Sequence, residues 1–546
     1  MGCCNRRCGL IAGAVFGAVV AILGGILIPV GNSLIEGTVK KEAVIEPGTT
    51  AYDNWVSTGG MVYRQFWLFD VQNAQEVIQN GSSPVVVEKG PYTYRTRYLA
   101  KENITFYPNH TAAFLLPQGA IFEPSMSVGS DEDKVTTLNL AVAGSYSLVP
   151  EVLHAALENM IKKSNSSLFQ TRTVHELLWG YIDPMLKDNV GLFAPYNGTY
   201  DGYYNVYTGK DDISKVGIID MWQGHRSLGF WNDTYCDMIN GTDASSFAPF
   251  VDKKKPLYFF SSDICRSVSA GFEESMDLKG IEVYRYTLQP NTLASPTENP
   301  DNRCFCKSFK TTRNCTLAGV LDVSSCKGGQ PVFISLPHFL HGSAYLRENV
   351  QGLNPSEEHH GTFLDVEPTT GFTLRVLKKI KDYTIFPLVW LNETAAVDDE
   401  TADMFKEELI SRIDMLDIIQ KALIGTGVCI FILCLISYCV VRRNLWEVIA
   451  AVAALPPVQQ GLQFSQVPPE RSRWLLLVLL LLLLFLLEAR LSAGLKADSS
   501  SLGCNELAQA HGDCCLSVST LTMASLSTRR RILATVRLKL FSVVRQ

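Results

Sequence analysis

The sequence lacks two kinds of pattern, long basic stripes and catalytic motifs. Charged residues make up only 19% of the chain, the net charge is −6, and no long basic stripe occurs before the C-terminal part. This argues against nucleic-acid binding as a main task. No G-x-S-x-G elbow, phosphate-binding Gly-Lys loop or dinucleotide fingerprint occurs. We therefore expect a protein that is not an enzyme and needs no cofactor.

Metal-binding motifs are also incomplete. His175 and Glu176 begin like a zinc-protease helix, but Trp179 stands where the second histidine is needed. His359 and His360 are adjacent, so on a helix or strand their side chains point apart. We expect no metal site.

Two long uncharged runs are present, and both are typical of membrane-spanning helices. Residues 9–30 and 422–441 contain no charged side chain, and a span needs about 20 apolar residues. Arg6 and Arg7 precede the first run, and Arg442 and Arg443 follow the second. The positive-inside rule then places both termini in the cytosol and residues 31–421 outside. A cleaved signal peptide is the alternative for the first run, and a buried core helix for the second.

These runs divide the chain into five parts. Residues 1–8 form a cytosolic tail, 9–30 and 422–441 the spans, and 31–421 the extracellular domain. The remaining residues, 442–546, form an atypical cytosolic tail that we expect to be disordered. Residues 474–487 are almost entirely leucine, but this run is short for a third span.

Acceptor triplets for N-linked glycans support this topology. Nine N-x-Ser/Thr triplets occur, all within residues 31–421: Asn80, Asn103, Asn109, Asn165, Asn197, Asn232, Asn240, Asn314 and Asn392. Confinement of all nine to one predicted compartment indicates passage through the secretory pathway.

The cysteines follow the same division. Six lie in the extracellular part: Cys236, Cys265, Cys304, Cys306, Cys315 and Cys326. An even number in an oxidising compartment predicts three disulfides, and the spacing alone leaves their pairing open. Cys3, Cys8 and Cys439 lie beside the inner ends of the spans, where palmitoylation is expected.

The extracellular part is predicted to be α+β. Residues 61–69 and 83–87 are short β-branched and aromatic runs, typical of strands. Residues 150–187 have helical spacing, with a capping box from Thr173 to Glu176 and a stop at Pro184. In the first span, Gly9, Gly13 and Gly17 share one helix face and could allow close contact with another helix.

Colinear motifs indicate a family. The motifs are residues 9–15 (GLIAGAV), 63–67 (YRQFW), 90–95 (GPYTYR), 119–124 (GAIFEP), 298–302 (ENPDN), 335–340 (SLPHFL) and 391–394 (LNET). In these motifs and their order the chain resembles the class B scavenger receptors, and within them the fatty acid translocase branch, over residues 1–443.

The resemblance implies a fold and a function. It implies a large extracellular antiparallel β barrel-like domain with a helical apical bundle and a lipid tunnel, anchored by two transmembrane helices. The implied ligands are long-chain fatty acids and oxidised lipoproteins, and the implied partners are collagen and thrombospondin. The implied disulfides are Cys236–Cys304, Cys265–Cys326 and Cys306–Cys315.

The same resemblance assigns ligand-binding residues. Lys163 matches a lysine at the tunnel entrance, and Lys162 is its neighbour of the same sign. An ammonium there would contact a carboxylate or an oxidised head group. Asn165 stands where the family shows a second lysine, and residues 106–110 contain no acid where it shows an acidic cluster linked to thrombospondin.

We therefore expect a plasma-membrane receptor that takes up fatty acids and modified lipoproteins. The alternatives are a cholesterol-exchanging lipoprotein receptor of the same family and a matrix adhesion receptor without lipid transfer. A lysosomal role fits least, because no acidic dileucine signal closes the tail.

Overall fold

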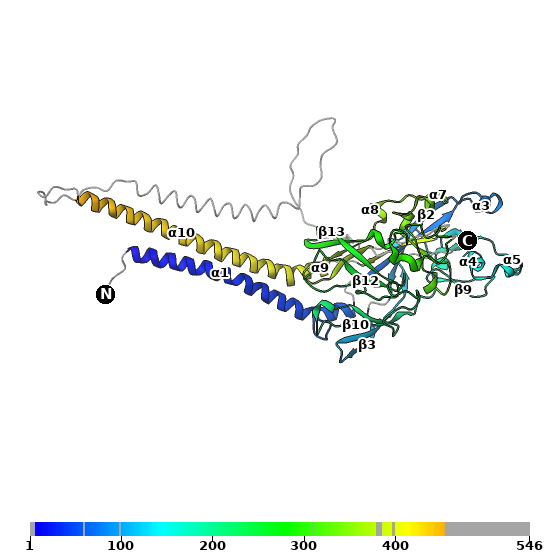
Figure 1. Ribbon diagram of the computed structural model, residues 1–546, viewed down its shortest axis with the longest axis horizontal. Coiled ribbons are helices and arrows are strands. Elements are labelled where there is room, and N and C mark those ends of the chain that lie inside the picture. The colour runs from blue at the N-terminus through cyan, green and yellow to red at the C-terminus, as the bar shows by residue number, and fades with distance from the viewer. Residues whose placement is uncertain are drawn as a thin grey trace, which may run out of the picture. The chain divides into compact units, whose positions relative to one another are not determined.

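The computed structural model describes residues 6–57, 61–97, 100–309, 311–377, 385–395 and 399–453. The chain divides into two compact units. The described part of one comprises residues 6–14 and 432–453, and that of the other residues 15–431. Each is considered by itself. Figure 1 gives the element labels.

Two long apolar helices contain the predicted spans. They are α1 (Arg6–Glu42) and α10 (Ser411–Ala453), and both are long and apolar enough to cross a membrane. Each extends beyond its predicted boundaries. Because α10 continues to Ala453, the first residues of the predicted tail are helical rather than disordered. The later tail, including residues 474–487, lies outside the described residues.

Glycines allow the two helices to pack closely. In the larger unit, a Cβ on Gly17 would lie 2.6 Å from the backbone nitrogen of Phe431 and 2.7 Å from the carbonyl oxygen of Gly427. In the smaller unit, a Cβ on Gly13 would lie 2.7 Å from Cys434 Sγ, whereas Gly9 has no such neighbour within 4 Å. Two of the three predicted contact glycines therefore face a neighbouring helix. Helix contacts in membranes favour small residues for this reason.

The larger unit contains three main antiparallel sheets. The first has the order β19 (Val389–Ala395), β1 (Val62–Val71), β2 (Val86–Thr96) and β5 (Ala120–Phe122). The second has the order β11 (Ile219–Trp222), β10 (Tyr200–Tyr207), β4 (Thr111–Pro117) and β3 (Glu102–Tyr107). The third has the order β12 (Leu257–Ser261), β13 (Arg266–Leu278), β14 (Ile281–Leu288), β17 (Phe363–Val366) and β18 (Thr373–Leu377).

Three two-stranded antiparallel sheets are also present among the described residues. They are β6 (Lys134–Leu138) with β7 (Phe169–Thr173), β8 (Tyr181–Ile182) with β9 (Asn189–Val190), and β15 (Leu321–Asp322) with β16 (Phe333–Ile334). Mixed helices and antiparallel sheets confirm the α+β prediction. Phe66, Leu68 and Tyr286 are almost fully buried in the main core, as expected for sheet faces turned inward.

Short helices precede, separate or follow these strands. They are α2 (Thr50–Val56), α3 (Ala74–Asn80), α4 (Leu140–Leu148), α5 (His154–Lys163), α6 (Val174–Trp179), α7 (Ala344–Glu348), α8 (Glu357–His360) and α9 (Asp399–Phe405). A π-helical turn, Lys406–Ile410, joins α9 to α10. The predicted helical region 150–187 thus contains α5 and α6, preceded by the 3₁₀ turn Glu151–Leu153.

The predicted capping box begins α6. The Glu176 backbone N–H donates to Thr173 Oγ1 at 3.1 Å, and the Thr173 N–H donates to the Glu176 carboxylate at 3.0 Å. The helix ends earlier than predicted, at Trp179, because Gly180 follows at φ 112°, outside the helical region. Tyr181 belongs to β8 and not to the helix.

Three disulfides are formed, two between segments 68 and 61 residues apart in sequence and one that closes a short loop. They link Cys236 with Cys304, Cys265 with Cys326, and Cys306 with Cys315. This is the pairing that the resemblance implies.

Eight of the nine glycan acceptors keep accessible side chains, and Asn392 does not. Asn392 lies on β19 opposite Gln65 of β1, its side chain is fully buried, and its amide nitrogen donates to Gln65 Oε1. A glycan is attached through that same nitrogen. The packing therefore leaves no room for one, and the expectation for Asn392 needs correction.

We predict that Asn392 is unmodified in the folded protein, whereas exposed acceptors such as Asn109 and Asn232 carry glycans. Peptide mapping by mass spectrometry after enzymatic deglycosylation in ¹⁸O water measures the occupancy of each site. High occupancy at Asn392 would contradict the β1–β19 pairing described here.

Candidate functional site

The lysines predicted to bind ligand lie at the C-terminal end of α5. Lys162 and Lys163 occupy its last turn and are both exposed. Among the described residues neither has an ion pair within 4.0 Å or a side-chain hydrogen bond. Positive charge at this end of a helix interacts favourably with the backbone dipole. The two ammonium groups are thus exposed at the end of the helix, and no carboxylate among the described residues neutralises them.

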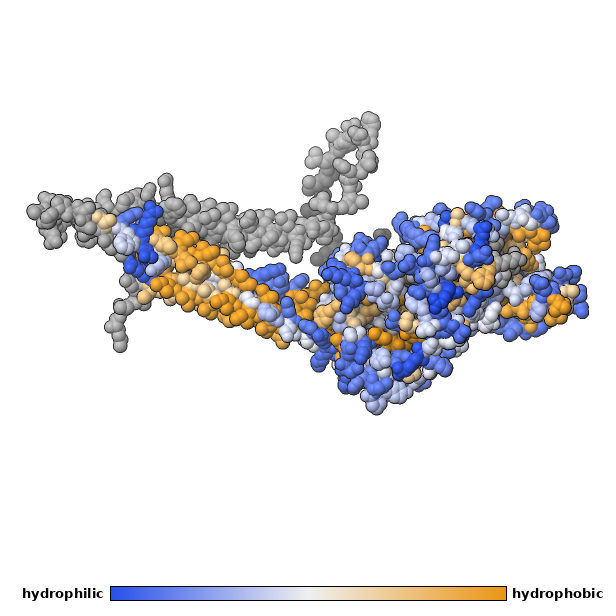
Figure 2. All heavy atoms as spheres, in the orientation of Figure 1, coloured by the Kyte–Doolittle hydropathy of each residue, from blue (hydrophilic) through white to orange (hydrophobic). Residues whose placement is uncertain are grey.

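Apolar side chains are exposed on α5 and on the segments just before it. Val152 is 85% exposed, and Leu148, Leu153 and Met160 are also exposed. Figure 2 shows apolar surface over α5 beside hydrophilic side chains. The helices are held by a small core of their own that contains Val142 of α4 and Leu157 of α5. Exposed apolar groups beside unpaired cations suit an amphiphilic ligand with an anionic head.

A second polar group of residues lies in the interior, where the three sheets approach one another. Arg64 of β1 pairs with Glu393 of β19 at 3.2 Å. Asp263, in the turn between β12 and β13, accepts a hydrogen bond from the Tyr196 hydroxyl at 2.7 Å. Asp201 of β10 accepts from Ser262 Oγ at 2.8 Å and from the Tyr204 hydroxyl. We call Arg64, Asp201, Asp263, Lys327 and Glu393 the interior cluster.

Burial shifts the ionisation of the interior cluster. It raises the pKa of Asp201 to about 6, with the Asp263 carboxylate adding to the shift. It also raises the pKa of Tyr196 and lowers the pKa of the Lys327 ammonium. The pKa of Arg64 is raised, because the attraction of Glu393 and Asp263 outweighs the burial that would lower it. Removal from water is the largest single influence on each of these groups, as expected of enclosed charges, and at Arg64 the attraction of the carboxylates outweighs it.

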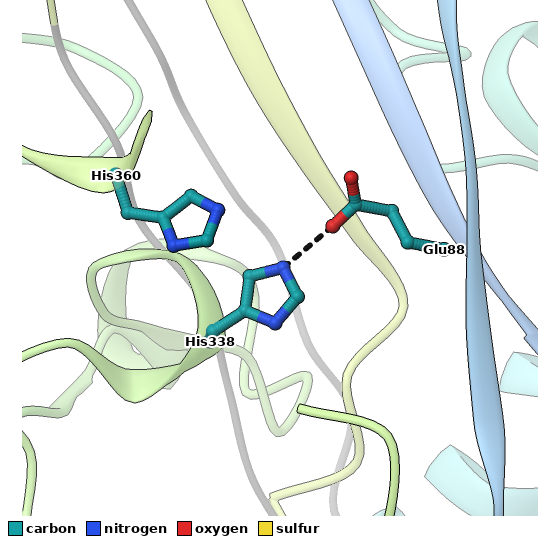
Figure 3. A group of neighbouring side chains, drawn as sticks. All are labelled: Glu88, His338 and His360. Carbon is teal, nitrogen blue, oxygen red and sulfur yellow. Dashed lines mark hydrogen bonds and ion pairs between the residues drawn. The ribbon is translucent and has the colours of Figure 1, made fainter. Parts of the chain in front are cut away.

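A third polar group consists of Glu88, His338 and His360 (Figure 3). His338 Nε2 lies 2.5 Å from the Glu88 carboxylate, and Trp390 Nε1 donates to the same oxygen at 2.8 Å. The two imidazole rings stack with their centroids 4.3 Å apart. One ligand atom from each of the three residues lies within 4.8 Å of the others, a spacing that would suit a zinc ion with two histidines and one carboxylate.

The backbone around the histidines does not fit a metal. The Asn354 N–H donates to His338 Nδ1 at 3.0 Å, and the Ser356 N–H donates to His360 Nδ1 at 2.9 Å. A neutral imidazole whose Nδ1 accepts a hydrogen bond carries its proton on Nε2. Both Nε2 atoms are then N–H donors and cannot bind a cation. The group is therefore a hydrogen-bonded network in which the His338 N–H binds Glu88.

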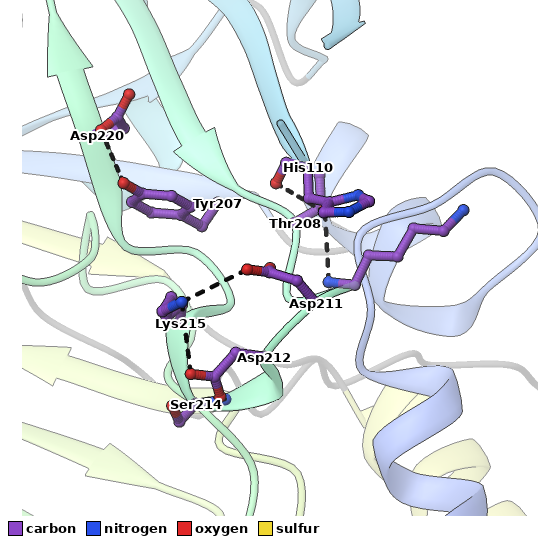
Figure 4. Close-up of polar contacts among 9 residues, drawn as sticks. His110, Tyr207, Thr208, Asp211, Asp212, Ser214, Lys215 and Asp220 are labelled. Carbon is purple, nitrogen blue, oxygen red and sulfur yellow. Dashed lines mark hydrogen bonds and ion pairs between the residues drawn. The ribbon is translucent and has the colours of Figure 1, made fainter. Parts of the chain in front are cut away.

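A further polar group joins the β3–β4 turn to the loop after β10 (Figure 4). The Thr208 hydroxyl donates to the carbonyl oxygen of His110 at 3.0 Å. Asp211 and Asp212, which follow in the same loop, lie 3.4 and 3.6 Å from the ammonium of Lys215. Residues 106–110 lack an acid in sequence, yet the loop joined to them carries two carboxylates. Lys215 partly neutralises both.

The cysteines predicted to be palmitoylated are only partly described. Cys8 and Cys439 are free and exposed, so their thiols are accessible. Cys3 lies outside the described residues.

Sequence reasoning missed the interior cluster and the Glu88 network. Their members come from distant segments, and adjacency of His359 and His360 suggested only that these two rings point apart. The available signals were isolated charged residues inside apolar strands, such as Arg64 in a run that ends FWLF. A charge at such a position needs a buried partner.

Comparisons with known proteins agree with one another. A family model described as the CD36 family matches residues 15–381 and 374–438. Lysosome membrane protein 2 from Rattus norvegicus is 37% identical over 402 residues, which cover 68% of this chain and 82% of that protein. Scavenger receptor class B member 1 from Cricetulus griseus is 32% identical over 447 residues, covering 76% and 86% respectively. Human lysosome membrane protein 2 is 37% identical over 403 residues.

We predict that the Glu88, His338 and His360 group takes up no zinc. Purified protein dialysed against micromolar zinc should show the same metal content as its His360→Gln variant by atomic absorption. A stoichiometric zinc ion lost in that variant would contradict the assignment of both Nε2 protons.

We predict that acid stabilises the fold through Asp201. Its pKa is higher in the folded state than in the unfolded chain, so its carboxylate costs stability at neutral pH. That cost, about 3 kcal/mol at most, falls away as the pH drops through 6 toward 4. Asp201→Asn should raise the melting temperature at pH 7.5 and flatten its dependence on pH between 4 and 7. Melting curves of the full chain over this range measure both effects. An Asn variant less stable at pH 7.5, with the dependence unchanged, would contradict the prediction.

Proposed function

Because the chain belongs to the CD36 family, we propose that it is a cell-surface scavenger receptor for long-chain fatty acids and oxidised lipoproteins. In this proposal it lies in the plasma membrane with both termini in the cytosol, and lipid passes through a hydrophobic tunnel in the extracellular domain. A curated relative named as a scavenger receptor supports the receptor role. Other relatives are named lysosome membrane protein 2. Membership of the family is therefore compatible with either membrane, and the plasma membrane is the location that we propose.

The observation that carries the proposal is the surface of α5. Lys162 and Lys163 offer unneutralised charge for a fatty-acid carboxylate or an oxidised head group. Val152 and Met160 offer apolar surface for the chain that follows the head group. This combination is what a receptor for anionic amphiphiles needs at its entrance.

The lipoprotein part of the proposal uses the same surface. An oxidised lipoprotein presents many anionic head groups at once, so weak contacts at α5 would add through multivalency. Collagen and thrombospondin remain proposed partners that the family resemblance suggests. The paired acids Asp211 and Asp212 offer negative charge near residues 106–110 for such a partner.

Replacing both α5 lysines should weaken fatty-acid binding. Lys162→Gln with Lys163→Gln removes two exposed charges, and we expect the Kd for oleate to rise roughly fivefold. The measurement is equilibrium binding of radiolabelled oleate to the full chain in nanodiscs, with empty nanodiscs as background.

The matched control is Lys254→Gln with Lys255→Gln, two exposed adjacent lysines in the loop before β12. The control should bind oleate like the wild type. Equal losses in both variants would show a nonspecific charge effect and contradict the role of α5.

A further inference from the structure

Two buried histidines lie at a junction between the first and the third sheet. His338 Nε2 donates to Glu88 of β2, which belongs to the first sheet (Figure 3). His360 ends α8, and β17 of the third sheet begins shortly after it. The two imidazole rings stack with an interplanar angle of 15°, and the His360 ring also meets the Trp390 ring of β19 edge-on. The stacked rings therefore connect the segment that leads into β17 with the first sheet.

The segment that carries His338 has a strained backbone. His338, Phe339 and His341 have φ values of 51°, 54° and 58°, in the left-handed region. Residues with a side chain rarely occupy this region, and the conformation persists only where surrounding contacts hold it. His338 and Phe339 are buried, so their packing supplies such contacts. We therefore expect this segment to relax when the contacts of His338 are lost.

Backbone donors occupy one nitrogen of each ring. The Asn354 N–H donates to His338 Nδ1 at 3.0 Å, and the Ser356 N–H donates to His360 Nδ1 at 2.9 Å. A neutral imidazole accepts at one nitrogen, whereas an imidazolium carries a proton on both and accepts at neither. Protonation of either ring therefore turns its backbone contact into two N–H groups that face each other. The backbone of residues 354–356 must then move away from that ring.

The charges around the two rings differ. The Glu88 carboxylate accepts from His338 Nε2 and so attracts a further proton to that ring. The His360 ring packs against the rings of His338 and Trp390, neither of which carries negative charge. Once one ring is protonated, a second proton on the other is disfavoured across 4.3 Å, because like charges repel strongly in a buried place. One protonation is enough to break one backbone contact.

Exposed ionisable groups beside the rings contribute less. Glu357 of α8 lies 2.6 Å from His341 Nε2, and both side chains are more than 60% exposed. Glu358 and His359, on the same helix, are exposed as well. Acid would charge His341 and strengthen its pair with Glu357, which opposes a movement of α8. Water and salt screen such exposed pairs, so the two buried rings dominate the response to acid.

We propose that His338 and His360 form an acid-sensitive latch between the first and third sheets. The latch is closed while both rings are neutral and opens when either ring is protonated. Opening frees residues 354–360 and loosens the start of β17. This inference goes beyond the proposed function, because it does not depend on which ligand the receptor binds. It gives the domain a conformational response to an acidic compartment.

Hydrogen exchange of backbone amides measures the latch directly. The full chain in nanodiscs is labelled at pH 7.5 and at pH 5.0, with labelling times scaled for the intrinsic effect of pH on exchange, and is then digested and mapped by mass spectrometry. We expect protection of residues 351–362 to fall about tenfold at pH 5.0, while peptides of β13 stay equally protected. Exchange resolves this local event, whereas melting curves also report Asp201.

Asparagine substitutions test the cause of the opening. An asparagine Oδ1 can accept a backbone hydrogen bond as a histidine Nδ1 does, but it takes up no proton in this range of pH. The double variant His338→Asn with His360→Asn should therefore show the same protection of residues 351–362 at both pH values. The matched control is His359→Asn, which changes an exposed histidine of the same helix and should leave the acid response as in the wild type.

Protection of β13 at pH 7.5 verifies that each variant is folded. Where the double variant fails this criterion, His360→Asn alone replaces it, and the loss of protection at pH 5.0 must then be smaller than in the wild type. Equal protection of residues 351–362 at both pH values in the wild type would overturn the inference. Acid opening that persists unchanged in the asparagine variant would also overturn it, as would a simultaneous loss of protection in β13, which indicates general unfolding.

Discussion

This fold depends most on one constraint, which is the free-energy cost of enclosing charged side chains where three sheets approach one another. Arg64 and Glu393 pair across the β1–β19 contact, Asp201 comes from β10, and Asp263 comes from the turn between β12 and β13. Each buried charge would be costly alone and becomes tolerable only through its partners. The Cys265–Cys326 bond adds Lys327 to the same place. Stability and its response to pH therefore both depend on one group of residues.

The two polar groups deep in the protein differ in what they can do. The Glu88 network is satisfied, because backbone N–H groups fix both histidine tautomers and Glu88 accepts from His338 and Trp390. It links β2 to β19 across β1 in the first sheet and does not need a ligand. Among the described residues, the interior cluster keeps one buried donor without a hydrogen-bond partner, Arg64 Nε. Proximity of histidines and a carboxylate is thus a weaker guide to a metal or ligand site than the count of unmade hydrogen bonds.

Much of the local structure could be predicted from the sequence. Uncharged runs of membrane length predicted α1 and α10, and the spacing from Thr173 to Glu176 predicted the start of α6. Both predictions succeeded because these features depend on residues that are close in sequence. The end of α6 was predicted too late because Gly180, not Pro184, breaks the helix. The disulfide pairing followed only from the resemblance to a family, since spacing leaves it open.

The candidate sites were less predictable, because their members meet only after folding. Nothing local to His360 indicates His338 or Glu88, and nothing local to Arg64 indicates Asp263. Asn392 shows the opposite error, because a triplet that matches the glycan motif is buried by strand pairing. Sequence motifs report local chemistry, whereas burial and pairing decide whether that chemistry is available.

The most direct test of lipid passage past the interior cluster is photo-crosslinking of a fatty-acid methyl ester that carries a diazirine on the carbon next to its carbonyl. The full chain in nanodiscs is irradiated, digested and mapped by mass spectrometry. The account predicts labelled peptides around Lys327, Arg64 and Tyr196, and loss of that labelling when excess unlabelled ester competes. Competable labelling restricted to α5 and the membrane helices would show that lipid does not reach the cluster and would contradict the account.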